Sequence, residues 1–155
     1  MGAPPFEAGK DYQSLMSDHE FKLDWRKQWD LFTTQKHIYQ DGVWLEIDNI
    51  AALDRKPKLV LQFFQDWQKM DWYCWHDGII GWFCAVELEN PAMQRCLLGV
   101  GAKEWKRDER YVYFYKHTID APETITFHEF NQRCKAHQQH APQPVEEAHV
   151  EEPTV

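Results

Sequence analysis

Apolar residues recur every three or four positions in the segment 17–33, which is the spacing of a helix with one buried face. An S-x-x-E capping box, from Ser17 to Glu20, marks where this helix begins. The repeating apolar positions are Phe21, Trp25, Trp29 and Phe32. We therefore expect a helix over 17–33 that packs three or four of its aromatic rings against a sheet.

Two further helices are expected, one in the middle of the chain and one near its end. The segment 57–70 begins with a proline, which suits a first helical position, and its apolar residues fall on one helical face. The run 58–64 would also serve as a strand, and the length of the whole segment favours the helix. A second capping box, from Thr126 to Glu129, predicts a helix from 126 to about 138.

The remaining hydrophobic pattern has the period of strands. The pair Asp41-Gly42 separates the β-rich runs 37–40 and 43–47, which is a strong hairpin signal. Farther along, a second Asp-Gly pair at 77–78 predicts another hairpin. The later strands are expected at 72–76, 79–88, 94–105 and 110–117. This order predicts an α+β fold: an antiparallel sheet, made of a hairpin plus a four-strand meander, with two or three helices packed on it.

Length and composition indicate one domain with two peripheral segments. A chain of 155 residues with 43% hydrophobic residues can bury one core, which we assign to residues 17–140. Residues 1–16 contain Pro and Gly and have weak periodicity, so we expect a flexible arm. Residues 141–155 contain four Glu and neither Lys nor Arg, so we expect a disordered acidic tail.

The charge and the missing targeting signals narrow the possible partners and the location. The net charge of −8, from 25 acidic and 17 basic residues, argues against direct binding to nucleic acid or to an anionic membrane. The sequence has no apolar run of about 18 residues, as a membrane span requires, and its first residues lack the pattern of a secretory signal. We therefore expect a cytoplasmic protein with no membrane association.

Cysteine and histidine residues raise the question of a metal site. The chain contains the cysteines Cys74, Cys84, Cys96 and Cys134. In the cytosol they are expected to stay reduced and to pack as small apolar side chains. Cys74 and His76 would share one face of a strand, but alternation places Cys84 on the opposite face. The C-x-x-H-x-x-H run at 134–140 has no second pair at zinc-finger spacing. No metal or other cofactor is therefore predicted, and a zinc-supported interaction domain ranks third among the functional hypotheses.

Aromatic residues make up 15% of the chain, including eight Trp, and they give the leading functional hypothesis. Both faces of the predicted second hairpin are apolar, whereas a half-exposed sheet alternates apolar with polar side chains. One face is therefore either a Trp-rich core or an exposed aromatic surface of the kind that binds other proteins. The expected partner-binding residues are Trp75, Trp82, Glu87, Glu89 and Tyr113.

The leading hypothesis is a non-enzymatic protein-binding domain, an inhibitor or adaptor that occludes a site on a larger protein partner. Small size, acidity and many interface-type aromatic residues are typical of proteins that phages or mobile elements use against host machinery. They are also typical of immunity proteins that block a toxin. An acidic surface would speed association with the basic cleft of a nucleic-acid-binding partner.

The alternative hypothesis is a small-ligand-binding or enzymatic pocket in a curved sheet. Its expected lining residues are Trp82, Tyr113, Tyr115 and His117. The sequence has no phosphate-binding glycine loop, nucleophile elbow or metalloprotease motif, so no catalytic residue is assigned. A cavity of a few hundred Å³ with convergent polar groups would favour the pocket, and a fully packed interior would favour the protein binder.

Overall fold

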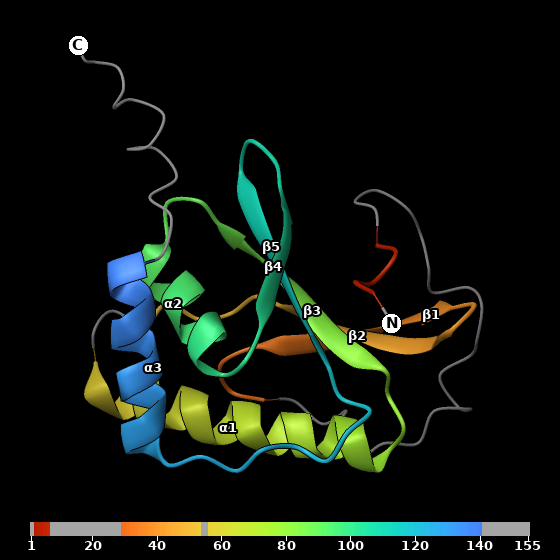
Figure 1. The fold of residues 1–155 in the computed structure, drawn as a ribbon, viewed down its shortest axis with the longest axis horizontal. Helices are drawn as coiled ribbons and strands as arrows, with labels where there is room; N and C mark the ends of the chain where they lie inside the picture. Colours follow the sequence, from red (N-terminus) through yellow and green to blue (C-terminus); the bar gives the residue numbers. More distant parts are fainter. Residues whose placement is uncertain (1, 7–28, 54–55, 141–155) are drawn as a thin grey trace.

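The computed structural model describes residues 2–6, 29–53 and 56–140 of the chain, and these form a five-stranded sheet with three helices (Figure 1). The strands are β1 Thr33–Tyr39, β2 Gly42–Asp48, β3 Gly81–Glu87, β4 Lys103–Arg107 and β5 Tyr111–His117. The helices are α1 Pro57–His76, α2 Pro91–Gly99 and α3 Phe127–His140. The α+β class expected from the sequence is confirmed.

The sheet is mixed, which corrects the expectation of a purely antiparallel one. Its strand order is β1-β2-β3-β5-β4, and β2 and β3 run parallel while the other neighbours are antiparallel. Parallel neighbours need a crossover connection, and α1 supplies it between β2 and β3. The predicted four-strand meander was therefore wrong, because helices replace two of its segments.

The first replaced segment is 72–76, which forms the last turns of α1 and not a strand. Aromatic residues such as Trp72 and Trp75 suit strands, but the buried positions of α1 recur at helical spacing through Cys74. Asp77-Gly78 ends this helix in a Schellman motif, in which the Gly78 N–H donates to the Trp75 carbonyl and the Ile79 N–H to the Cys74 carbonyl. Gly78 has a φ of 75°, a left-handed conformation that both a hairpin and a helix end require. The same dipeptide signal therefore fits both structures.

The second replaced segment is the first half of the predicted strand 94–105, which belongs to α2. The Asn90 side chain caps this helix by accepting a hydrogen bond from the Met93 N–H at 3.1 Å, and Pro91 takes the first helical position. The helix ends at Gly99, and only residues 103–107 continue as a strand, β4. The Asn90 cap and Pro91 therefore favour a helix in this segment, although residues typical of strands follow.

Several elements agree with the sequence. The hairpin at Asp41-Gly42 forms between β1 and β2, and β3 and β5 lie within the predicted strands 79–88 and 110–117. The second capping box is confirmed, since the Glu129 N–H donates to Thr126 Oγ1 and the Thr126 N–H to the Glu129 carboxylate.

The predicted first helix mostly lies outside the described residues. Its capping box and its residues up to 28 are not among the described residues, and residues 29–32 have no helical structure before β1 begins. The tail 141–155 and most of the predicted arm also lie outside the described residues.

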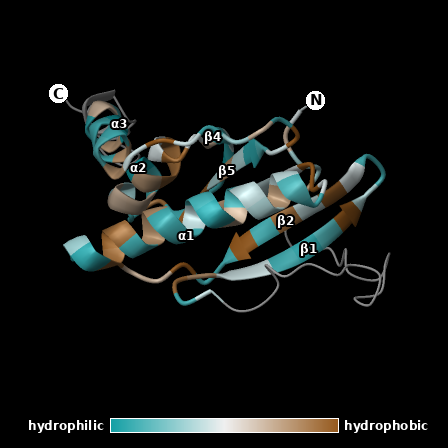
Figure 2. Ribbon diagram, turned by 90° about the horizontal axis from the view of Figure 1, so that it is seen from below, coloured by the Kyte–Doolittle hydropathy of each residue, from teal (hydrophilic) through white to brown (hydrophobic). Residues whose placement is uncertain are grey.

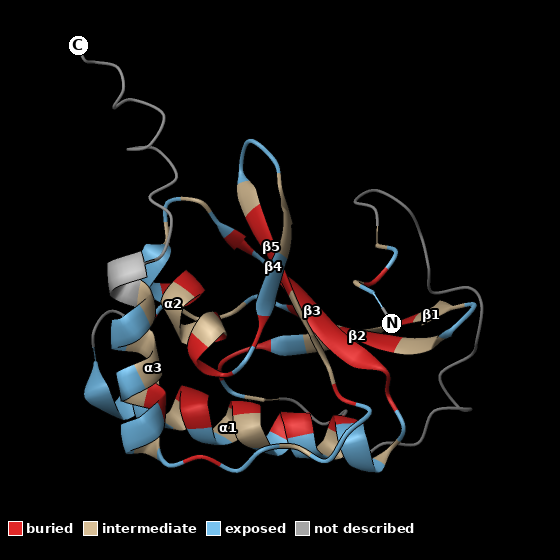
Figure 3. Ribbon diagram, in the orientation of Figure 1, coloured by how far each residue is buried: buried red, intermediate tan, exposed pale blue. Residues whose placement is uncertain are grey.

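The core lies mainly between the sheet and the three helices. One hydrophobic cluster joins buried residues of all three helices to one face of the strands, including Trp67, Trp82, Leu97 and Phe130. Figure 2 shows α1 lying across the sheet, and Figure 3 shows buried positions on α1, α2 and the central strands. The opposite face holds a smaller cluster around Trp44 and Phe83. Both faces of the central sheet are therefore covered, which explains why β3 is apolar on both sides.

Candidate functional site

The parallel strands β2 and β3 stay together at one end and separate at the other. They pair over only three residue pairs, from Trp44–Gly81 to Glu46–Phe83, although β2 continues to Asp48 and β3 to Glu87. In Figure 1 the two strands diverge toward α2. Their carboxyl ends therefore form the two sides of a V-shaped opening in the sheet, which we call the crevice.

A cavity of about 220 Å³ occupies the crevice. Its lining residues come from the end of β2, the end of β3 and the start of α2: Ile47, Asp48, Asn49, Ile50, Ala85, Val86, Glu87, Asn90 and Met93. β2 pairs with β1 along its far edge, and β3 pairs with β5. Within the described part of the chain, no strand pairs with the two edges that face each other beyond Glu46 and Phe83. The crevice is thus bordered by strand edges without a strand partner.

Acidic groups surround the crevice. Asp48 and Glu87 line it, and Glu46 lies at its apex, where it forms a 2.8 Å contact with Nε2 of the buried His37. Burial raises the pKa of Asp48 above its usual value, and the nearby Glu46 carboxylate raises it further. The opening therefore combines apolar walls with a few polar groups, which is typical of small-molecule sites.

The N-terminus of α1 lies at the same end of the sheet, because α1 follows the carboxyl end of β2. Among the residues that the structure describes, no side chain caps it, and its first turn contains no acidic residue. Lys56 and Lys58 flank the first helical residue, Pro57, and both are exposed. An uncapped helix N-terminus beside two lysines favours an anionic group, because the free N–H groups and the helix dipole attract negative charge.

A second cavity, of about 680 Å³, lies along α1 from Phe64 to Tyr73, between this helix and the segment 118–125. Asp71 lies in its wall and is almost completely buried. Its carboxylate accepts hydrogen bonds from Trp82 Nε1 at 2.9 Å and from Lys116 Nζ at 2.5 Å. Both carboxylate oxygens of Asp71 therefore have a partner, as a buried charge requires, and the arrangement is explained by the stability of the fold.

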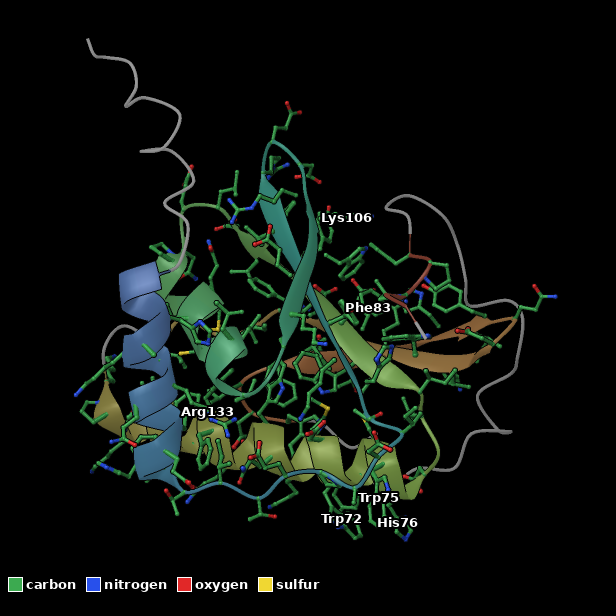
Figure 4. All side chains as sticks on the ribbon, viewed as in Figure 1. Trp72, Trp75, His76, Phe83, Lys106 and Arg133 are labelled. Carbon is green, nitrogen blue, oxygen red and sulfur yellow. The ribbon has the colours of Figure 1, made fainter. Side chains whose placement is uncertain are left out.

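Exposed aromatic side chains form a patch near the C-terminus of α1. Trp72 is 43% exposed and Trp75 is 37% exposed, and the Trp72 ring stacks on His76 with 4.8 Å between centroids. Figure 4 shows these three side chains projecting from α1 away from the sheet. We call them the α1 aromatic patch.

The structure places the predicted partner-binding residues in different environments. Trp75 and the two acids, Glu87 and Glu89, are exposed. Trp82 has no exposed surface, and Tyr113 is 6% exposed and donates its hydroxyl hydrogen bond to Asp108. The expectation that Trp82 is an exposed anchor is therefore corrected: it is a core residue under α1.

The exposed residues of the predicted partner-binding set do not share one face of the molecule. Trp75 lies on α1 near the amino end of β3, while Glu87 ends β3 and lies at the crevice. The seven residues of β3 span roughly 20 Å at strand spacing. The two groups were expected to be close because the sequence suggested one hairpin, whereas Trp75 lies on a helix.

The residues of the alternative pocket also separate. Tyr113, Tyr115 and His117 follow one another at every second position of β5 and so share a face, whereas Trp82 points to the α1 side. His117 lines the larger cavity, and its Nε2 contacts the Gly2 carbonyl at 2.8 Å. Both cavities described above are of suitable size, but of the four expected residues they include His117 and not Trp82, Tyr113 or Tyr115.

The zinc candidates are distributed over several elements. Cys74 and His76 are on α1 and Cys84 is on β3, while Cys134 and His137 are on α3. The described part of the chain contains no group of three or more His, Cys, Asp or Glu that could hold a metal ion.

Sequence reasoning missed the crevice residues Asp48, Asn49 and Met93. The one signal that pointed to them is Asn90-Pro91, which is a helix start as well as a chain break. Reading it as a helix start would have placed α2 directly after β3 and brought Asn90 and Met93 to the carboxyl end of that strand.

Comparisons with known proteins found no relative. No family model, no curated protein and no solved structure matches this chain. None of the described helices combines the length and apolar composition needed to cross a membrane.

Proposed function

We propose that this protein binds a small molecule in the crevice between β2 and β3, in agreement with the alternative hypothesis drawn from the sequence. The observation that carries the proposal is the separation of two parallel strands beyond Glu46 and Phe83, with a cavity between them. In open sheets with parallel strands, ligands bind in the opening beyond the carboxyl ends of neighbouring strands. The crevice is at that position.

The walls of the crevice favour a ligand with a narrow, extended arm that carries secondary amides. A strand edge presents alternating N–H and C=O groups, and peptide-like amides satisfy them as a neighbouring strand would. The cavity of about 220 Å³ admits a chain and not a bulky ring system. The pantetheine arm of coenzyme A has this chemistry: it is linear and contains secondary amides.

The start of α1 favours an anionic group on the same ligand. Its uncapped N–H groups and the exposed Lys56 and Lys58 lie at the crevice end of the sheet. A phosphate placed there would receive backbone hydrogen bonds and the attraction of two cations. Coenzyme A carries phosphates at one end and the amide arm at the other, and we use it as the first probe.

Isothermal titration calorimetry with coenzyme A and with pantetheine tests the proposal. Ala85 lines the crevice and Ala121 lines the larger cavity, and both are exposed. We expect Ala85→Trp to reduce coenzyme A affinity at least tenfold, since the new ring fills the crevice, and Ala121→Trp to leave it unchanged. Pantetheine, which lacks the anionic part, should bind more weakly than coenzyme A and show the same response to Ala85→Trp.

If Ala121→Trp weakened coenzyme A binding and Ala85→Trp left it unchanged, the ligand would bind in the larger cavity and the crevice would be rejected as its site. Thermal unfolding of both variants provides the control for folding, because each substitution is at an exposed position. Absence of binding by both probes to the folded wild-type protein would rule out a pantetheine-type ligand.

A second candidate function is the inhibitor or adaptor role expected from the sequence, and the α1 aromatic patch favours it. Trp72 and Trp75 are about one helical turn apart and both are exposed, and exposed Trp residues often provide most of the binding energy of an interface. The acids Glu87 and Glu89 are distant from this patch, so they would steer a basic partner without touching the same site. The net charge of −8 supports a protein partner over nucleic acid.

Affinity capture at low and at high salt tests this second function. We expect a protein captured by the wild type to be lost with Trp75→Ala at either salt concentration. A capture that Trp75→Ala and Trp72→Ala leave unaltered would exclude the α1 aromatic patch from the interface.

A further inference from the structure

Two cysteines from different helices meet where α2 packs against α3. Cys96 is on α2 and Cys134 is on α3, and both are half-buried free thiols. They pack at the margin of the main core, on the side where α3 covers α2. Neither takes part in the crevice or in the α1 aromatic patch.

Gly99 allows the two helices to approach closely at this point. A β-carbon added to Gly99 would lie 2.8 Å from Cys134 Sγ and 3.1 Å from the Phe130 ring, which is closer than real side chains pack. Cys134 Sγ therefore lies directly against the backbone of α2. Cys96 is three residues before Gly99 and so lies on the same face of α2, next to the incoming thiol.

The two thiols also interact chemically. The neighbouring Cys96 thiol lowers the pKa of Cys134, while the neighbouring Cys134 raises the pKa of Cys96, and the charge of Arg95 favours a thiolate at either position. Cys74 and Cys84 differ, because both are completely buried and burial raises the pKa of each thiol. The chain thus has one reactive pair and two protected cysteines.

We propose that Cys96 and Cys134 form a reversible disulfide when the protein meets a peroxide. The Cys134 thiolate attacks one oxygen of hydrogen peroxide, the O–O bond breaks, and a sulfenic acid and hydroxide result. The Cys96 thiolate, formed as its proton passes to that hydroxide, then attacks the sulfenic sulfur. An S–S bond forms, the S–O bond breaks, and the departing hydroxide takes up the proton that Cys134 released when its thiolate formed. Two thiols and one peroxide thus become one disulfide and two waters.

The bond would fix α3 to α2 and would close a loop that contains β4, β5 and the segment 118–125. A disulfide that closes a long loop restricts the unfolded chain, so we expect oxidation to raise the melting temperature by about 5 °C or more. A thiol such as dithiothreitol should reverse both the bond and the change in melting temperature.

Mass spectrometry of the full chain after peroxide treatment tests the proposal. We expect the loss of two hydrogens from the protein and, after proteolysis without reductant, a cross-linked peptide that joins Cys96 to Cys134. In the same digest Cys74 and Cys84 should remain free thiols, which gives an internal control with no substitution. Cross-links through Cys74 or Cys84, or free thiols at both Cys96 and Cys134 after peroxide treatment of the folded protein, would overturn the proposal.

Two variants identify which thiol reacts first. Cys96→Ser leaves Cys134 without a resolving thiol, so we expect dimedone to label a sulfenic acid at Cys134. Cys134→Ser should give much weaker labelling, because the Cys96 thiol is less acidic. Equal labelling of the two variants, or stronger labelling of Cys134→Ser, would contradict the assigned order of attack.

Discussion

The two ends of the β2–β3 pair have opposite structures, and the contrast explains why a site can exist in the middle of a sheet. At the amino end of β3 the strands are sealed. Gly81 is buried there, and an added β-carbon would lie 2.5 Å from both the Lys116 carbonyl oxygen and the Trp44 ring. At the carboxyl end the exposed Ala85 borders an open cavity. The sealed end provides stability, and the open end is available for a ligand.

The two tryptophans that sequence analysis placed together now provide the strongest test of this contrast. Trp82 is buried at the sealed end and donates a hydrogen bond to Asp71, whereas Trp75 is an exposed residue of α1. Trp82→Ala should lower the free energy of unfolding by about 3–5 kcal/mol, because it leaves a cavity and removes a hydrogen bond from a buried acid. Trp75→Ala should cost less than about 1 kcal/mol. If chemical denaturation showed the same loss of unfolding free energy for both variants, the assigned burial of Trp82 and exposure of Trp75 would be contradicted.

Two substitutions in β3 compare the two ends of this strand directly, and their expected effects on the free energy of unfolding are smaller. Gly81→Ala should lower the free energy of unfolding by about 1–3 kcal/mol, because the new methyl group overlaps Trp44 and the strand backbone. Ala85→Trp adds a much larger side chain at the open end, and we expect it to change stability by less than about 0.5 kcal/mol. Urea titration of the two variants measures both values. A larger loss for Ala85→Trp would mean that the crevice is packed and not open.

The helix starts give a third comparison. Thr126 caps α3 through its hydroxyl oxygen, while Lys56 before α1 provides no cap. Thr126→Ala should therefore lower the free energy of unfolding by about 1 kcal/mol, and Lys56→Asp, at a position with extended backbone that suits a cap, should raise it by a similar amount.

Lys56→Asp also separates the two parts of the proposed ligand. The introduced carboxylate occupies the free N–H groups and repels phosphate, so coenzyme A should bind less tightly while pantetheine binding stays the same. Equal effects on both compounds in calorimetry would show that α1 does not hold the anionic part.

The smallest expected effect is a pH dependence at the crevice. The pKa of Asp48 is raised from its usual 3.8, chiefly by burial. Its contribution to stability is therefore present at pH values below 3.8 and is lost as the pH rises through the higher pKa of the folded state. Asp48→Asn should stabilise the protein relative to wild type at pH 7 and have less effect at pH 3.

The contribution of Asp108 to stability should have the opposite pH dependence. The Tyr113 hydroxyl lowers the pKa of Asp108, so its contribution is present at neutral pH and is lost as the pH falls. Asp108→Asn should therefore destabilise at pH 7 and have little effect at low pH. Denaturant titrations of Asp48→Asn and Asp108→Asn at pH 3 and pH 7 measure the change in the free energy of unfolding. If both variants changed it in the same direction at pH 7, the account would be contradicted.

The parts of this fold that could be predicted from sequence are those with strong local signals. The Thr126–Glu129 box and the Asp41-Gly42 hairpin depend on residues close together in the chain, and both form as expected. Asp77-Gly78 misled the prediction because a glycine with positive φ serves a helix end as well as a hairpin.

The crevice was not predictable in the same way. It depends on two strands, β2 and β3, that are separated in sequence by α1, and on the register at which they stop pairing. No local pattern encodes that register. Ala85 and Asn49 therefore had no distinguishing feature in the sequence, and the aromatic residues that did stand out are largely core.

The central claim is that the ligand binds at the open end of the β2–β3 pair. Amide chemical-shift changes during a pantetheine titration of the isotope-labelled protein test it most directly. We predict the largest changes at residues 47–50 and 85–90, with the amides at 68–73 and 118–125 unaffected. Changes concentrated at 68–73 and 118–125 would place the ligand in the larger cavity and contradict the account.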